Sequence, residues 1–190
     1  MIIDENIYKR NGWNPGELVN IDEENTVNSY TVKLDFELNK SYKFEYSLNS
    51  VQSGETTSYI YIMPNNVSSA FWLVRPYWYG NGTASSSGNS AFSRPTNLYI
   101  QSLTNNPGRD PVPSSGEFII DALETDYGYT LRGYNVRYGY NSDLLFADYG
   151  AIARLTELGG EMENLVFKGD GTGSGYPQWY GTIATSMLER

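Results

Sequence analysis

Neither cysteine nor histidine occurs among the 190 residues of the chain. Without cysteine there is no disulfide framework and no thiolate metal site. Without histidine, the Ser-His-Asp and Cys-His arrangements of nucleophilic catalysis are excluded, and so are histidine-based metal sites. Hydrophobic packing must therefore hold the fold together, and a chain of this length is expected to bury about two thirds of its unfolded surface.

Long apolar runs and basic clusters are missing as well. No stretch approaches the roughly 18 apolar residues that a membrane span needs, and the start, with Asp4 and Glu5, lacks the apolar region of a secretory signal. We therefore expect no membrane partner, and synthesis in the cytoplasm. The 13 basic residues are scattered among 22 acidic ones, for a net charge of −9. Because binding phosphates requires a basic stripe, we expect no nucleic-acid partner.

Tyrosine, tryptophan and glycine, by contrast, are plentiful, with 17, 4 and 19 copies. Aromatic residues fit pleated sheets, and glycine serves turns. From Tyr30 to Leu48, apolar and polar residues alternate in two runs separated by Asn39 and Lys40. Alternation of period two predicts half-buried antiparallel strands. With about seven to nine short strands expected, the predicted class is all-β, an antiparallel two-sheet β-sandwich of jelly-roll type, with a barrel as the second choice.

The remaining strands are predicted from shorter patterns. They are expected at residues 59–63, 71–74, 98–103, 118–120 and within 127–140. Residues 81–90, of low complexity, and 105–116, which contain three prolines, are expected as exposed loops, while 144–155 fits either a strand or a helix. We assign residues 1–160 to the sandwich domain. Residues 161–190 are predicted to be a C-terminal tail or docking segment that either returns to the sheet or binds a neighbour.

Two groups of aromatic residues are candidate binding sites. The first surrounds a proline and consists of Phe71, Trp72, Tyr77, Trp78 and Tyr79. Such rings, when exposed, stack on the apolar faces of sugars or anchor protein interfaces; the alternative is that they belong to the core or cover one open end of the sandwich. The second group, proposed for docking of the tail, consists of Tyr176, Trp179 and Tyr180.

Carboxylates are the remaining candidates for chemistry. Glycoside hydrolysis needs two at a fixed separation, and the candidates are Asp121, Glu124, Asp126, Asp143 and Asp148. No spacing singles out a pair, so we predict that the protein is not an enzyme and keep a glycosidase or lyase as a third hypothesis. Residues 169–175 offer a single carboxylate, Asp170, and no lysine, which favours a linker over a calcium or phosphate loop. We expect no cofactor. A structural calcium ion, helped by Glu117 or Asp121, is left open, and its ligands are unknown.

Residues 38–48, LNKSYKFEYSL, follow a polar segment that contains Trp13. This arrangement resembles the entry of an aromatic strand into the sheet in carbohydrate-binding-module-like jelly rolls. Such modules are similar in turn to sandwich domains of bacteriophage tail, baseplate and head-appendage proteins. The resemblance covers residues 10–63 and, more vaguely, 144–158. The family's binding residues are not carried over, because no paired tryptophans align with its sugar platform.

The resemblance implies a non-catalytic structural or adhesion component of a bacteriophage particle, such as a capsid-decorating protein, a head fibre or a tail or baseplate appendage. Location in the virion fits a native start at Met1 and the absence of a signal. The implied partners are other virion proteins or further copies of the chain, with a homo-trimer favoured. The alternative function is a carbohydrate-binding module that recognises glycans, including those of a host surface, through Trp72, Tyr77 and Trp78.

Overall fold

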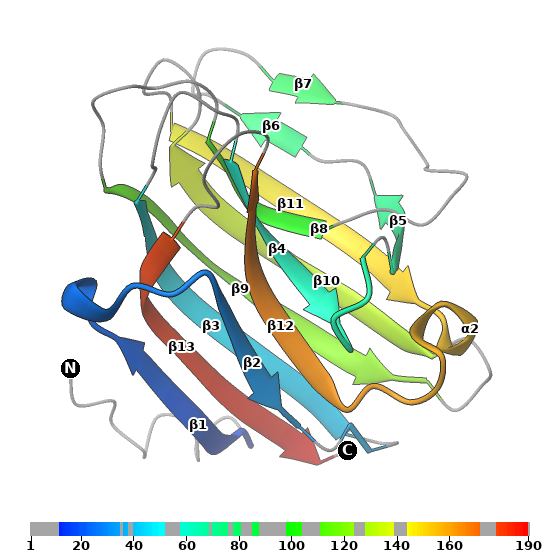
Figure 1. Cartoon of the computed structure of the whole chain (residues 1–190). Coiled ribbons are helices and arrows are strands. Elements are labelled where there is room, and N and C mark those ends of the chain that lie inside the picture. Colours follow the sequence, from blue (N-terminus) through cyan, green and yellow to red (C-terminus); the bar gives the residue numbers. More distant parts are fainter. Residues whose placement is uncertain are drawn as a thin grey trace.

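The computed structural model describes residues 12–34, 36–37, 40–51, 58–68, 70–75, 78–80, 85–87, 98–103, 111–123, 128–138, 144–171 and 178–189. Thirteen strands occur in these ranges. They form two antiparallel sheets packed on one another (Figure 1), so the predicted all-β sandwich is confirmed. No helix in the ranges given is long and apolar enough to cross a membrane. The number of strands exceeds the expected seven to nine because segments predicted as loops or tail also pair.

The larger sheet contains nine strands. They are β1 (Asn14–Ile21), β3 (Lys40–Val51), β5 (Phe71–Arg75), β6 (Trp78–Gly80), β7 (Ser85–Ser87), β9 (Val112–Ala122), β10 (Tyr129–Tyr138), β11 (Leu144–Ala153) and β13 (Gln178–Glu189). Their spatial order is β1, β13, β3, β9, β10, β11, β6 and β7, and β5 also pairs with β11.

The smaller sheet contains four strands and lies in front of the larger one in Figure 1. In spatial order they are β2 (Ser29–Lys33), β12 (Asn164–Gly171), β4 (Ser58–Pro64) and β8 (Leu98–Leu103). Among the described residues, two short helical segments accompany the sheets. They are the 3₁₀ helix η1 (Glu23–Asn25) and α2 (Leu155–Leu158), which connects β11 to β12. The segment 144–155, predicted as strand or helix, is therefore a strand that leads directly into a single helical turn.

The stretch from Tyr30 to Leu48 crosses from one sheet to the other. Only the start of its first run, up to Lys33, forms β2 in the smaller sheet, and Leu34, Phe36 and Glu37 are not strand. Its second run forms β3 in the larger sheet, so the two strands do not pair with each other. The alternation still reports burial correctly: Val32, Phe44 and Leu48 are fully buried. Each run therefore presents its apolar side to the same core from opposite directions.

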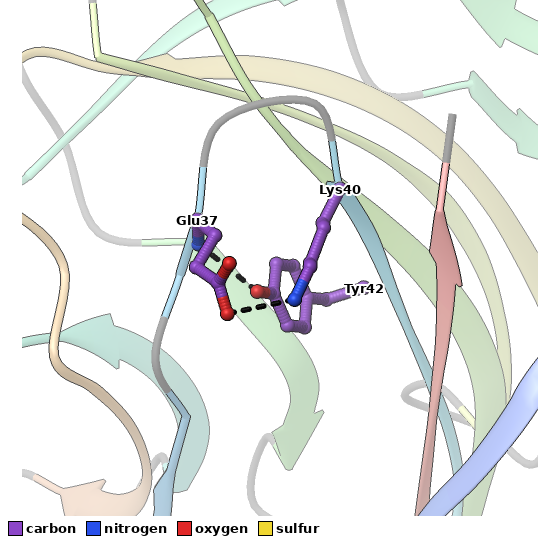
Figure 2. A network of polar contacts seen from close by, with 3 residues as sticks. All are labelled: Glu37, Lys40 and Tyr42. Carbon is purple, nitrogen blue, oxygen red and sulfur yellow. Dashed lines mark hydrogen bonds and ion pairs between the residues drawn. The ribbon is translucent and has the colours of Figure 1, made fainter.

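A small polar network lies at this crossing (Figure 2). The Lys40 Nζ is 2.7 Å from Oε1 of Glu37, and the backbone N–H of Glu37 donates a hydrogen bond of 2.9 Å to the Tyr42 hydroxyl. The Tyr42 ring packs against Phe36 at a centroid distance of 4.7 Å, and both rings are buried. Because exposed ion pairs contribute little to stability, burial of the two rings is the main force that fixes the crossing.

Aromatic rings from both sheets meet at the centre of the core. Phe44 and Phe118, on neighbouring strands of the larger sheet, stack at 4.7 Å. Phe167 of β12 approaches them from the smaller sheet at 6.5 and 6.2 Å, and all three rings are fully buried. Burial of one such side chain stabilises the fold by about 1.5–3 kcal/mol, so this cluster makes a large contribution to holding the sheets together.

A bulge in β8 explains two buried polar side chains. Ile100 is an extra residue in the pairing of β8 with β4 and lies opposite no residue of β4. Its carbonyl instead accepts hydrogen bonds from Asn135 Nδ2 at 2.8 Å and from Ser114 Oγ at 3.1 Å. Both donors belong to the larger sheet and are buried. The bulged carbonyl therefore links the two sheets through polar contacts inside the core.

The predicted boundary at residue 160 is not a boundary of the sandwich. β12 lies between β2 and β4 of the smaller sheet, and β13 lies between β1 and β3 of the larger one. Of the two alternatives stated for residues 161–190, return to the sheet is the one that these strands adopt. The physical reason is the apolar content of both strands, which bury Leu165, Phe167, Trp179 and Ile183 in the core.

Two segments predicted as loops contain strand. Within 105–116, β9 begins at Val112 and pairs with β3 through Pro113. The pairing of β9 with β10 begins only at Ser114, so no described residue of β10 pairs with Pro113, and a proline is tolerated at such a margin of a sheet. Within 81–90, β7 pairs with β6 along three residues. The serines of β7 thus extend the edge of the sheet through their backbone. The segment contains no alternation of apolar residues, so the sequence does not predict this strand.

Candidate binding groove

The aromatic group around residue 75 is divided between the core and the strands beside β11. Phe71 is 1% exposed and belongs to the core, which supports the packing alternative for this ring. The backbones of Trp72, Trp78 and Tyr79 lie in β5 and β6, and both strands pair with β11. Tyr77 lies outside the described residues. The backbone thus places three of these residues close to β11.

The aromatic residues proposed for docking of the tail have different environments. Trp179 is fully buried, and its Nε1 donates a hydrogen bond of 3.3 Å to the carbonyl of Asn28. Tyr180 is half-buried in β13, and Tyr176 lies outside the described residues. Trp179 therefore anchors β13 to the core of its own chain.

Of the five carboxylates considered for hydrolysis, two fall on described strands. Asp121 is buried in β9 and accepts a hydrogen bond of 2.6 Å from Ser41 Oγ, while Asp148 is exposed on β11. Those outside the described residues are Glu124, Asp126 and Asp143. Asp170 lies in β12. Across the part of the chain that is described, no three acidic side chains gather in a way that would hold a metal ion.

A groove of about 580 Å³ crosses β9, β10 and β11 on the larger sheet. Along β10, Tyr129 and Leu131 are buried in the core, so Thr130, Arg132 and Tyr134, which alternate with them, lie on the outer face. Outward residues from all three strands line the groove, among them Glu117, Thr130, Arg132, Tyr134, Asp148 and Ile152. The groove thus lies on the face that the smaller sheet does not cover.

Strand register sets the pattern of side chains across the groove. Tyr134 lies opposite Glu117 of β9 on one side and opposite Asp148 of β11 on the other. One step along the same face, Arg132 lies opposite Gly150 of β11. Because glycine has no side chain, the surface is hollowed beside the arginine. The ring of Tyr134, which lies between two carboxylates, is therefore adjacent to the guanidinium of Arg132. That guanidinium in turn lies beside the depression at Gly150.

Two aromatic rings are exposed at this place. Among the large hydrophobic residues described, those exposed are Leu18 (56%), Tyr134 (41%) and Phe146 (45%). Tyr134 and Phe146 stack with their centroids 5.9 Å apart and their planes inclined by 20°; we call them the ring pair. Leu18 lies on β1, with three strands between it and β10. Of the two exposed rings among the described side chains, Tyr134 thus lines the groove and Phe146 stacks on it.

A lysine on the neighbouring strand holds one of the groove's carboxylates. Lys43 of β3 places its Nζ 3.2 Å from Oε2 of Glu117 and 3.2 Å from Oε1 of Glu45. Partial burial would lower the pKa of Lys43, but the hydrogen bonds to Glu117 and Glu45 raise it above its ordinary value. The amine is therefore charged at neutral pH, and Oε2 of Glu117 is engaged.

Most of the groove was not identified by sequence reasoning. Glu117 and Asp148 were considered only as ion ligand and catalytic acid, and Tyr134 only as part of a tyrosine-rich strand. Arg132 and Phe146 were not singled out. The alternation along 127–140 places Tyr134 and Val136 on one face of a strand, but that signal does not say which face is covered by the second sheet.

Comparison of the chain with protein-family models and with curated proteins gives no match. The chemistry of the groove therefore has to be argued from its own side chains. Exposed rings offer an apolar face, carboxylates accept hydrogen bonds, and a guanidinium donates several. This combination suits a ligand that has both apolar faces and many hydroxyl groups.

Proposed function

We propose that the protein is a non-catalytic adhesion component of a bacteriophage particle that binds glycans through the groove and the ring pair. The observation that carries the proposal is the exposed ring of Tyr134, which lines the groove and stacks on the exposed ring of Phe146. Glu117, Arg132 and Asp148 line the same groove. A binding site of this kind needs few polar groups if they are accurately placed. Here they are mounted on adjacent strands of a sheet, which gives them a rigid support.

The chemistry of sugars fits these groups. A sugar ring has C–H groups that pack on an aromatic face, and hydroxyl groups that both donate and accept hydrogen bonds. Glu117 and Asp148 offer acceptors on either side of Tyr134, and Arg132 offers donors one step along the strand. The ring pair thereby provides contact area and the polar groups provide orientation.

The same geometry supports binding rather than hydrolysis. A glycosidase holds the scissile bond between its two carboxylates. The side chain of Tyr134 occupies the position between Glu117 and Asp148, because these residues lie opposite it on the two neighbouring strands. A sugar packed on Tyr134 would place its hydroxyl groups, rather than a glycosidic bond under attack, near the carboxylates.

We further infer that the sandwich is a jelly roll. With β5, β6, β7, β10 and β11 set aside, the remaining eight strands, renumbered 1 to 8 along the chain, have the orders 1-8-3-6 and 2-7-4-5. What supports the inference is that consecutive strands change sheet at every step except from 4 to 5, which are neighbours in the smaller sheet, and that this order is the one of a jelly roll built from two Greek keys. Jelly rolls occur among viral capsid and lectin domains, which agrees with both a virion location and glycan recognition, although a fold alone does not establish either.

Glycan binding is tested with the ring pair. Wild-type protein, Tyr134→Ala and Phe146→Ala are titrated against the polysaccharides that score on a glycan array, and Leu18→Ala serves as the control for loss of an exposed hydrophobic side chain. Each ring variant is expected to weaken binding roughly two- to tenfold, and the double variant to abolish it, while Leu18→Ala binds as wild type does. Unchanged binding by the double variant, or an array without hits, would refute the proposal.

The virion part of the proposal is tested separately. We expect the protein to sediment with phage particles and to form a homo-oligomer, with a trimer favoured. Edge strand β1, which exposes Leu18, is a surface through which copies or other virion proteins would pair. A protein that is strictly monomeric by light scattering and absent from particle fractions, yet binds glycans, would instead be a carbohydrate-binding module outside a virion.

A further inference from the structure

The groove has two chemically different ends. At one end, Tyr134 lies between two carboxylates. At the other end, Ile119 of β9 lies opposite Arg132, and next to this pair Ile152 of β11 lies opposite Thr130. Both isoleucines line the groove and are half-buried. Thr130 and Tyr134 are about 13 Å apart along the extended strand, so a ligand that fills the groove meets an aromatic, polar surface first and an apolar one further along β10.

A depression lies between these two ends, at Gly150. This glycine lines the groove and lies opposite Arg132. Its neighbours on the same face of β11 are Asp148 and Ile152, two residues before and after it. Because glycine has no side chain, another group can approach the backbone closely at this position. The depression therefore has room for a group about as large as a small side chain, with Ile152 as an apolar wall.

Arg132 supplies hydrogen-bond donors beside the depression. Its side chain is exposed, and its guanidinium makes no hydrogen bond or ion pair with the residues that the structure describes. A guanidinium has several N–H donors and no acceptor, so Arg132 can donate to an oxygen atom of a ligand without losing such a contact. Room for a few atoms, an apolar wall and a donor together suit a short group that consists of a methyl group and a carbonyl.

We propose that the depression at Gly150 binds the acetyl group of an acetylated sugar, and that Gly150 and Arg132 make the groove selective for such sugars. This inference rests on the proposed function and names its class of ligand. The sugar ring packs on Tyr134, the methyl group of the acetyl substituent lies against Ile152, and its carbonyl oxygen accepts a hydrogen bond from Arg132. Tyr134 and Gly150 are diagonal neighbours on adjacent strands, about 7–8 Å apart. One sugar ring with its acetyl substituent can span this distance.

Two neutral trisaccharides with the same backbone test the preference, with the purified full chain and titration calorimetry. Triacetylated chitotriose carries an acetamido group on each sugar where cellotriose carries a hydroxyl group. The acetylated trimer is expected to bind about tenfold more tightly, because it buries a methyl group and accepts one further hydrogen bond. Cellotriose that carries O-acetyl groups tells whether an ester-linked acetyl group is accepted as well, and it should also bind more tightly than cellotriose.

Variants of the depression test where the acetyl group binds. Gly150→Val fills the depression with a residue that suits a strand, at a position with regular pairing to β10. It should remove the roughly tenfold preference and change the affinity for cellotriose by less than about twofold. Gly150→Ala, the smaller change, should remove part of the preference. Arg132→Met removes the donors and should lower the preference about two- to fivefold. Ser115→Val adds the same side chain at an exposed position of β9 outside the groove and is the control.

The outcomes separate this inference from the proposed function. Equal affinity for the two trimers, or tighter binding of cellotriose, overturns the preference for acetyl groups. A preference that persists in both Gly150 variants overturns its location in the depression, and one that persists in Arg132→Met overturns the role of the arginine. Tyr134→Ala should weaken both trimers alike. A chain that binds other glycans but neither trimer retains the proposed function and loses this inference, whereas a chain that binds no glycan loses both.

Discussion

The two hydrogen bonds on the bulged carbonyl of Ile100 should be strongly coupled. Ser114→Ala or Asn135→Ala removes one donor and leaves the other, so the buried carbonyl stays paired. Each single change is expected to cost about 1 kcal/mol for the hydrogen bond. In Asn135→Ala the cavity adds to this cost, whereas removal of the buried Oδ1, which has no partner among the described residues, reduces it. The double variant leaves a buried carbonyl with no donor, which costs a further 1–3 kcal/mol or so. The double loss should therefore exceed the sum of the single losses.

Urea unfolding followed by tryptophan fluorescence measures this coupling. The free energies of unfolding of wild type, both single variants and the double variant form a double-mutant cycle, which is valid if the m-values agree. Ser115→Ala, at the exposed neighbouring position, is the control and should change stability by less than about 0.5 kcal/mol. Losses that add to within about 0.5 kcal/mol would refute the coupling through Ile100.

Two further predictions concern single residues. Burial raises the pKa of Tyr129, whose hydroxyl accepts a hydrogen bond of 2.9 Å from the N–H of Met162. The unfolded chain therefore loses the phenolic proton of Tyr129 at lower pH than the folded chain does. The free energy of unfolding should fall as pH rises above about 10. Tyr129→Phe should flatten this fall, measured by urea titrations at several pH values, and cost about 1 kcal/mol at neutral pH. If stability falls as steeply with pH in the variant as in wild type, the fall does not come from Tyr129. Gly181 has φ 134°, and a Cβ there would overlap the Ser47 carbonyl oxygen, whereas Gly159 has φ 71° and open space. Gly181→Ala should cost more than about 2 kcal/mol and Gly159→Ala about 1 kcal/mol; equal losses in thermal unfolding would argue against the overlap.

Strands with a clear local period were predictable from sequence. Alternation along 30–48 identified the buried side chains of β2 and β3, and the apolar runs at 59–63 and 98–103 correspond to β4 and β8. Pairing partners were not predictable in the same way. The neighbours of β3 are β9 and β13, which come much later in the chain. Local pattern reports which side of a strand is apolar, whereas the partner is decided by packing of the whole sandwich.

The site was harder to predict than the fold, because tyrosine occurs both as a core residue and as an exposed residue of the groove. Tyr129 and Tyr134 lie on the same strand, yet one is buried in the core and the other is exposed at the groove. Density of aromatic residues drew attention to the segment around residue 75, where Phe71 is a core residue. Polar side chains gave no better guide, since Asn135 is buried because of a bulge on another strand.

The position of β13 between two strands that precede it in the chain has a consequence for how the molecule folds. β13 pairs with β1 on one side and with β3 on the other. Until the chain has been made as far as Glu189, both of these strands present open edges, and the larger sheet cannot close. Pairings between such distant segments make folding slow, and open edges in the interval favour mispairing with other chains. We therefore expect folding to be completed only after synthesis of β13, with yield limited by aggregation of chains that have not yet inserted it.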